Sequence, residues 1–182
     1  MKRFIRFDGL LVAAIVAAVA TQVAHAGPAE PAVPSAIQVP DGNKVFLVGH
    51  AVGVQIYSCD ATPSGYRWGF LAPRANLYDN GKLVATHFAG PTWQARDGSR
   101  VVGRVVDRVS VDATSIPWLL LSAGSTAGGP DGDRLVGTTY IQRIATTGGL
   151  APSAADCTAD TASTTAEVPY TADYYFWKAV GR

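Results

Sequence analysis

Residues that could do chemistry gather in the stretch HFAGPTWQARDGS, residues 87–99. It holds His87, a Gly-Pro pair, Trp93, and an Asp-Gly turn that contributes Asp97 and Ser99. A histidine, a carboxylate and a serine are the parts of a nucleophilic triad. These three lie across one expected hairpin, however, and the chain has no G-x-S-x-G sequence. We therefore interpret His87 first as a hydrogen-bonded strand residue, and we predict no catalytic residue.

The histidines could also bind a metal ion. His50 and His87 are the two that follow residue 26, and a carboxylate such as Asp97 could join them around zinc or copper. They lack the short His-x-His or His-x₃-His spacing, and two distant cysteines do not complete a zinc site. A metal-dependent enzyme or small extracellular hydrolase centred on His87 is therefore the alternative, and we predict no metal site and no cofactor.

Aromatic residues favour a binding role instead. The chain has four tryptophans, and aromatic rings on β-sheets can stack on sugar rings or anchor protein interfaces. We expect Trp118 and Trp177 in the core. Trp93 follows a Gly-Pro corner and precedes a turn, so we expect it to be the most exposed. The hypothesis is a ligand-binding pocket walled by four residues: His87, Trp93, His50 and Tyr57.

The segments that must position these residues are of β type. Asn80-Gly81 between apolar runs is a strong hairpin signal, because a type I′ turn needs positive φ at both central residues. A second tight turn is expected at residues 97–99. Segments rich in apolar and β-branched residues, bounded by turn residues, are expected as strands. They cover residues 44–59, 66–71, 76–78, 82–88, 92–94, 100–112, 117–122, 134–146 and 170–180.

This pattern predicts an all-β protein with a single antiparallel β-sandwich or flattened barrel of about eight strands. Charged residues interrupt valine pairs in residues 100–112, which we interpret as an edge strand or a twisted one. Residues 27–38 are rich in Pro and Ala and are expected to form a tether or extended arm. The β domain then covers residues 39–182.

Residues 1–26 have the pattern of a cleaved secretory signal peptide. A basic start precedes the short apolar run of residues 9–20, and Ala24 and Ala26 fit a signal peptidase site. A membrane-spanning helix needs about 20 apolar residues, and polar residues interrupt this run. We therefore expect a secreted protein, periplasmic or extracellular, with no membrane span after cleavage.

The composition limits the partners and the redox state. The formal net charge is +1 at pH 7, and no basic run provides a footprint for nucleic acid. Export would place Cys59 and Cys157 in an oxidising compartment, where they can form one intramolecular bridge. Two buried free thiols are the alternative.

Six segments, in order along the chain, carry a resemblance to a known family. They are GVQIYSC (53–59), WGFLAPRANLYDNGK (68–82), THFAGPTWQARDGS (86–99), IPWLLL (116–121), TTYIQRIATTGGLAP (138–152) and VPYTADYYF (168–176). From about Val39 to Trp177 the chain resembles the secreted bacterial and fungal family known as domain of unknown function 3455. The resemblance implies export, one β-rich domain and a Cys59–Cys157 bridge.

The resemblance implies no catalytic residue, because no activity is established for the family. Some fungal members carry a malate dehydrogenase label, but this chain lacks the strand, glycine turn and helix of a dinucleotide-binding unit. We expect a non-catalytic secreted protein that binds a cell-wall glycan or another surface partner, such as an extracellular protein.

Overall fold

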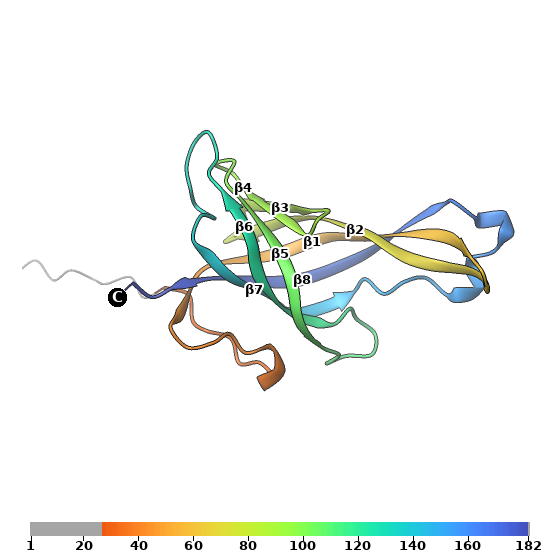
Figure 1. Cartoon of the computed structure of the whole chain (residues 1–182), viewed down its shortest axis with the longest axis horizontal. Helices are drawn as coiled ribbons and strands as arrows, with labels where there is room; N and C mark the ends of the chain where they lie inside the picture. The colour runs from red at the N-terminus through yellow and green to blue at the C-terminus, as the bar shows by residue number, and fades with distance from the viewer. Residues whose placement is uncertain (1–26, 182) are drawn as a thin grey trace, which may run out of the picture.

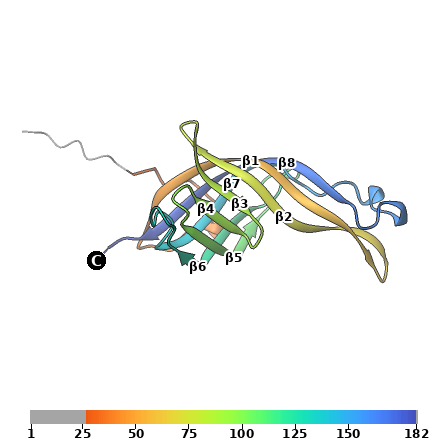
Figure 2. The same ribbon diagram turned by 90° about the horizontal axis from the view of Figure 1, so that it is seen from above.

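The computed structural model describes residues 27–181 and shows one antiparallel sheet of eight strands, closed into an irregular ring (Figures 1 and 2). Neighbours in sequence are neighbours in the ring, and β8 pairs with β1 to close it. The prediction of an all-β flattened barrel is confirmed. The strands are β1 (Asn43–Thr62), β2 (Gly65–Asp79), β3 (Lys82–Phe88), β4 (Thr92–Ala95), β5 (Arg100–Val109), β6 (Trp118–Ala127), β7 (Thr138–Gly148) and β8 (Thr165–Ala179).

Both expected tight turns are present. Asp79 pairs with Lys82, and the two residues between them have positive φ, 47° at Asn80 and 74° at Gly81. This is the backbone that a two-residue type I′ hairpin requires. The second turn, between β4 and β5, has Gly98 at φ 82°. The two turns set the register of the meander from β2 to β5.

Two details differ from the sequence-based expectations. Residues 66–71 and 76–78 belong to one strand, β2, which runs through Pro73. The pairing of β2 with β3 ends at Ala75, so at Pro73 the strand has β1 as its one neighbour. Proline is tolerated there because its missing N–H can point to the side that has no pairing strand. The edge expected at 100–112 is found in part: β5 pairs with β4 only through residues 100–102, and residues 104–109 pair with β6 alone. Arg104 and Arg108 lie on this part with one neighbour, where charged side chains discourage pairing with another strand.

Beyond the ring, β1, β2 and β8 continue as a twisted extension that carries the loop before β8 (Figure 1). Cys59 near the end of β1 is bridged to Cys157 in that loop, which confirms the expected disulfide. The bridge closes a segment with a sequence separation of 98 residues. Restricting so long a loop in the unfolded chain stabilises the fold by about 4.7 kcal/mol in the chain-entropy account.

The core inside the ring combines large rings with very small residues. Trp93, Tyr174 and Phe176 are among the largest fully buried side chains. Small residues occupy inward positions of β1 and leave room for these rings. A Cβ on Gly53, for example, would lie 2.5 Å from the Cβ of Ala75. The sequence VGHAVGV in β1 thus lets the strands approach while the aromatic rings fill the interior.

A second core lies outside the ring, under the N-terminal arm. The arm contains the short 3₁₀ helix η1 (Ser35–Ile37), and Ile37 is fully buried. It packs with Leu120, Ile144 and Trp177, which point outward from the ring. In Figure 1 the arm, in orange, lies below β7. Residues 27–38 are therefore a docked cover, and Trp177 is a core residue as expected.

The helices of residues 27–181 are three short 3₁₀ turns: η1, η2 (Ala154–Asp156) and η3 (Ala159–Thr161). Within this range no helix is both long and apolar enough to cross a membrane. The expected signal peptide lies outside the described residues.

Candidate functional site

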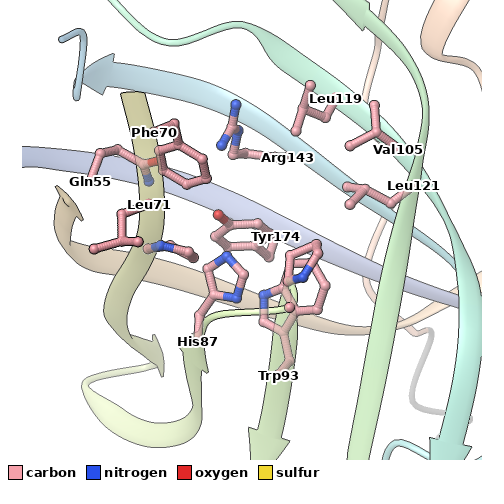
Figure 3. A pocket seen from close by; sticks show the side chains of 13 residues that line it. Gln55, Phe70, Leu71, His87, Trp93, Val105, Leu119, Leu121, Arg143 and Tyr174 are labelled. Carbon is pink, nitrogen blue, oxygen red and sulfur yellow. The ribbon is translucent and has the colours of Figure 1, made fainter. Parts of the chain in front are cut away.

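A cavity of about 330 Å³ opens into the ring, and Figure 3 shows its lining. The lining is mostly apolar and comes from all eight strands and the corner between β3 and β4. Ligand pockets in proteins commonly have volumes of about 300–1,000 Å³ and such a lining. The lining residues are Gln55, Phe70, Leu71, Pro73, His87, Gly90, Pro91, Trp93, Val105, Leu119, Leu121, Arg143 and Tyr174.

His87 and Trp93 form one wall of this cavity. They are directly opposite each other in the β3–β4 ladder, and both side chains point inward. Their rings stack with centroids 4.2 Å apart and planes 5° apart, which is the contact that cross-strand partners on one face can make. Gly103 on β5 leaves room for the indole: a Cβ there would lie 3.0 Å from Trp93 Cζ3. The stretch singled out in the sequence is thus both a built corner and a cavity wall.

His87 is buried, with 3% of its surface exposed. Its Nδ1 donates a hydrogen bond to the carbonyl of Thr92 at 2.9 Å, so Nδ1 carries the proton. Burial lowers the pKa of His87 from 6.5 to about 3, against the opposing effect of the Thr92 carbonyl. The ring is therefore neutral at pH 7, and a group with so low a pKa is a weak general base.

The expectation that Trp93 is the most exposed tryptophan is wrong, because only 1% of its surface is exposed. The Gly-Pro corner does break the strand, but the indole turns into the ring and contacts His87, Tyr174 and Phe176. Its Nε1 is buried without a hydrogen-bond partner. Within residues 27–181 the other such side-chain atom is Nε2 of Gln55, which also lines the cavity.

Arg143 and Tyr174 complete the polar part of the lining (Figure 3). Nε and Nη2 of Arg143 donate to the carbonyl of Pro117 at 3.2 and 2.8 Å. In the part of the chain that the structure describes, Arg143 makes no ion pair. Burial raises the pKa of Tyr174, so its hydroxyl is neutral and the guanidinium is the charged group in this cavity.

The rim of the cavity is apolar and exposed. A β-bulge in β2 makes Leu71 an extra residue, since Phe70 pairs with Tyr57 and Ala72 with Ile56. The bulge lets two consecutive residues, Phe70 and Leu71, face the same cavity. Phe70 is 56% exposed, Leu71 58% and Val105, on the facing strand, 46%. Exposed apolar residues around an apolar pocket are typical of a ligand entrance.

Tyr57 lies in a neighbouring lobe of about 370 Å³, which shares five lining residues with the first. Its hydroxyl donates to the carbonyl of Gly149 at 2.6 Å, and burial raises its pKa. The structure therefore brings Tyr57 into the same region as His87 and Trp93. The shared lining consists of Gln55, Phe70, Val105, Leu119 and Arg143.

His50 lies elsewhere, on the outer face of β1, and its Nδ1 contacts Oδ1 of Asp173 at 2.6 Å. The structure does not bring it into the cavity with His87. Among residues 27–181 there is no group of three or more His, Cys, Asp or Glu side chains that could hold a metal ion. The arrangement considered for a metal-dependent enzyme is thus not assembled in these residues.

Asp97 and Ser99 stabilise a turn. Asp97 accepts hydrogen bonds from the Ser99 hydroxyl at 2.6 Å and from the backbone N–H of Arg134 at 2.8 Å. These bonds, the one from the Ser99 hydroxyl first, lower the pKa of Asp97. Ser99 also accepts from the N–H of Leu135. Neither residue lines the cavity or bonds to His87, so the triad considered from the sequence is not formed.

Sequence reasoning missed Gln55 and Arg143. A signal was present in IQRI, residues 141–144, where two long polar residues interrupt an otherwise apolar strand. With a period of two, Arg143 shares the inward face with Ile141, while Gln142 and Ile144 face the arm. The sequence does not say that the arm covers one face of β7 and the ring encloses the other. It therefore does not say which of Gln142 and Arg143 lines a cavity.

The fold and site together define a class: a closed antiparallel β ring with an apolar, open cavity inside. Eight strands are enough to enclose side chains or one small ligand. Residues 40–178 match the family described as "Protein of unknown function (DUF3455)", so the chain belongs to that family and the resemblance noted in the sequence is confirmed. No curated protein and no solved structure is significantly similar to it.

Proposed function

We propose that this protein is an exported, non-catalytic binding protein that holds a small, largely apolar molecule inside the ring. The observation that carries the proposal is the cavity itself, with an apolar lining, an open entrance and exposed rim residues Phe70 and Leu71. Most of a small ligand could be removed from water there, and burial of apolar surface contributes about 25 cal/mol per Å².

Export is part of the proposal. Residues 1–26 have the composition of a secretory signal, and the Cys59–Cys157 disulfide is typical of oxidising compartments. The glycan or surface partner expected from the sequence stays a prediction. The cavity lining favours an apolar molecule instead, because sugar hydroxyls need more polar partners than this wall offers.

The experiment is a titration with the neutral fluorescent probe N-phenyl-1-naphthylamine. We expect saturable binding at one site per chain. Val105→Trp should abolish it, because residue 105 lines both lobes of the cavity and the indole would fill the entrance. Val106→Trp is the matched control: Val106 is 56% exposed and lines neither lobe. The proposal fails if the probe does not bind saturably, or if the two variants bind it alike.

A further inference from the structure

The cavity contains hydrogen-bond donors that have no acceptor. Nε1 of Trp93 and Nε2 of Gln55 are buried without partners, and their side chains are 1% and 2% exposed. Burying such a donor unpaired costs about 1–3 kcal/mol, so a native structure that keeps two of them in one cavity needs a reason. The two atoms have almost no accessible surface, so they lie behind the cavity wall and a ligand could pair with them only if the wall shifted.

Arg143 adds an unbalanced positive charge at the same place. Two of its nitrogens donate to the carbonyl of Pro117, which holds the guanidinium in position. An arginine has five N–H donors, so the two that donate to Pro117 leave others for the neighbouring Tyr174 hydroxyl and for a ligand. Among residues 27–181 the two lobes are lined by no Asp or Glu, and the second lobe adds another cation, Arg108. A positive charge in an apolar surrounding attracts an anion more strongly than it would in water.

Resting on the binding function proposed above, we infer that the ligand is an organic carboxylate with an apolar body. Its carboxylate binds at the guanidinium of Arg143. Its body lies against Phe70, Leu119 and Val105, which continue the wall toward the entrance. A carboxylate suits the planar guanidinium, which can donate to both oxygens at once.

The charge of Arg143 disfavours other ligand classes relative to an organic carboxylate. A cationic ligand would meet Arg143 with no acidic side chain in the described lining to offset the repulsion. A polyanion would need more cations than the cavity supplies. A neutral molecule would leave the guanidinium unpaired in a partly dehydrated site.

The test compares three ligands with one naphthalene skeleton: 2-naphthoate, 2-naphthalenemethanol and 2-naphthylmethylammonium. Each displaces N-phenyl-1-naphthylamine from the whole mature protein. We expect the carboxylate to bind about tenfold more tightly than the alcohol, as charge-assisted hydrogen bonds predict, and the ammonium ion to bind more weakly than the alcohol. In the variant Arg143→Gln, the affinity for the carboxylate divided by the affinity for the alcohol should fall to about one.

Arg104→Gln is the control, because Arg104 is an exposed arginine of β5 that does not line the cavity. Arg104→Gln should leave the ratio of carboxylate to alcohol affinity unchanged. Binding of the neutral probe by Arg143→Gln shows that this second variant is folded. Equal affinity of the wild type for carboxylate and alcohol overturns the inference, as does a ratio that survives in Arg143→Gln. The wild-type comparison needs no substitution. If the neutral probe binds but the wild type has equal affinity for carboxylate and alcohol, the proposed binding function stands. Only the inference that the ligand is a carboxylate then fails.

Discussion

A tryptophan and a glutamine are buried on each face of the barrel wall. Under the N-terminal arm, Trp177 Nε1 donates to Gln142 Oε1 at 2.9 Å, and Gln142 Nε2 donates to the carbonyl of Ile37 at 2.7 Å. Inside the ring, Trp93 Nε1 and Gln55 Nε2 have no partner. The same two residue types are thus fully paired on one face and unpaired on the other.

The difference distinguishes the packed core under the arm from the proposed binding cavity inside the ring. The arm-covered face behaves as a finished core, in which each indole and amide hydrogen bond is made within the chain. The cavity face leaves two buried donors unpaired and has a guanidinium with no Asp or Glu in the described lining, at a cost in stability. In the proposed binding function, the uncompensated charge of Arg143 marks the site, and a buried polar group on its own does not.

The largest expected contrast is between neighbours on β6. Leu120 is buried under the arm, whereas Leu119 is half-buried and lines the cavity. Leu120→Ala should cost about 2–5 kcal/mol of unfolding free energy, because a packed site loses contacts and gains a void. Leu119→Ala should cost less but weaken binding of the neutral probe. Chemical denaturation and probe titration check both, and equal losses of stability would contradict the distinction between the faces.

A smaller contrast is expected for the two tryptophans. Trp177→Phe leaves Oε1 of Gln142 buried without its donor, whereas Trp93→Phe removes a donor that already has no partner. Since an unsatisfied buried group costs about 1–3 kcal/mol, Trp177→Phe should be more destabilising by about that amount. Both variants remove the same atoms, so the difference in denaturation midpoint at constant slope is the measurement. A larger loss for Trp93→Phe would show that Trp93 is hydrogen-bonded in solution.

Over a single pH unit, the smallest expected effect is a pH dependence from the cavity wall. The unfolded chain protonates His87 near its ordinary pKa of 6.5, whereas the folded chain does so only near 3. Between these values the unfolded state binds more protons, so stability from this group is lost as pH falls, by at most about 1.4 kcal/mol per pH unit. His87→Phe removes the titration and should flatten the dependence of unfolding free energy on pH below 6.5. An unchanged slope would mean that the folded protein protonates His87 readily.

Most of the fold could be predicted from local signals. Asn80-Gly81 and Asp97-Gly98 specify tight turns through their own backbone preferences, and valine-rich runs specify strands. The edge expected at 100–112 holds only after residue 102, because the short strand β4 pairs with the first three residues of β5. Ring closure depends on the pairing of β8 with β1, which are far apart in sequence, and no local pattern reports that pairing.

The site was predicted in part for a related reason. His87 and Trp93 stood out by their types and by the corner between them, and cross-strand pairing does place them together. Their burial, the separation of His50 from them and the part played by Arg143 depend on which face of each strand points inward. Alternation specifies that two faces exist, but not which one encloses the cavity.

The sequence by itself determined that the protein is all-β, where the tight turns lie and that one disulfide can form. These properties follow from backbone preferences and from the presence of two cysteines. Only the tertiary structure decided that the arm covers one face, and that a guanidinium faces a cavity with no Asp or Glu in its described lining. Those properties depend on contacts between segments distant in sequence. Hydrogen-bond satisfaction of a buried group is decided by neighbours that local sequence does not specify.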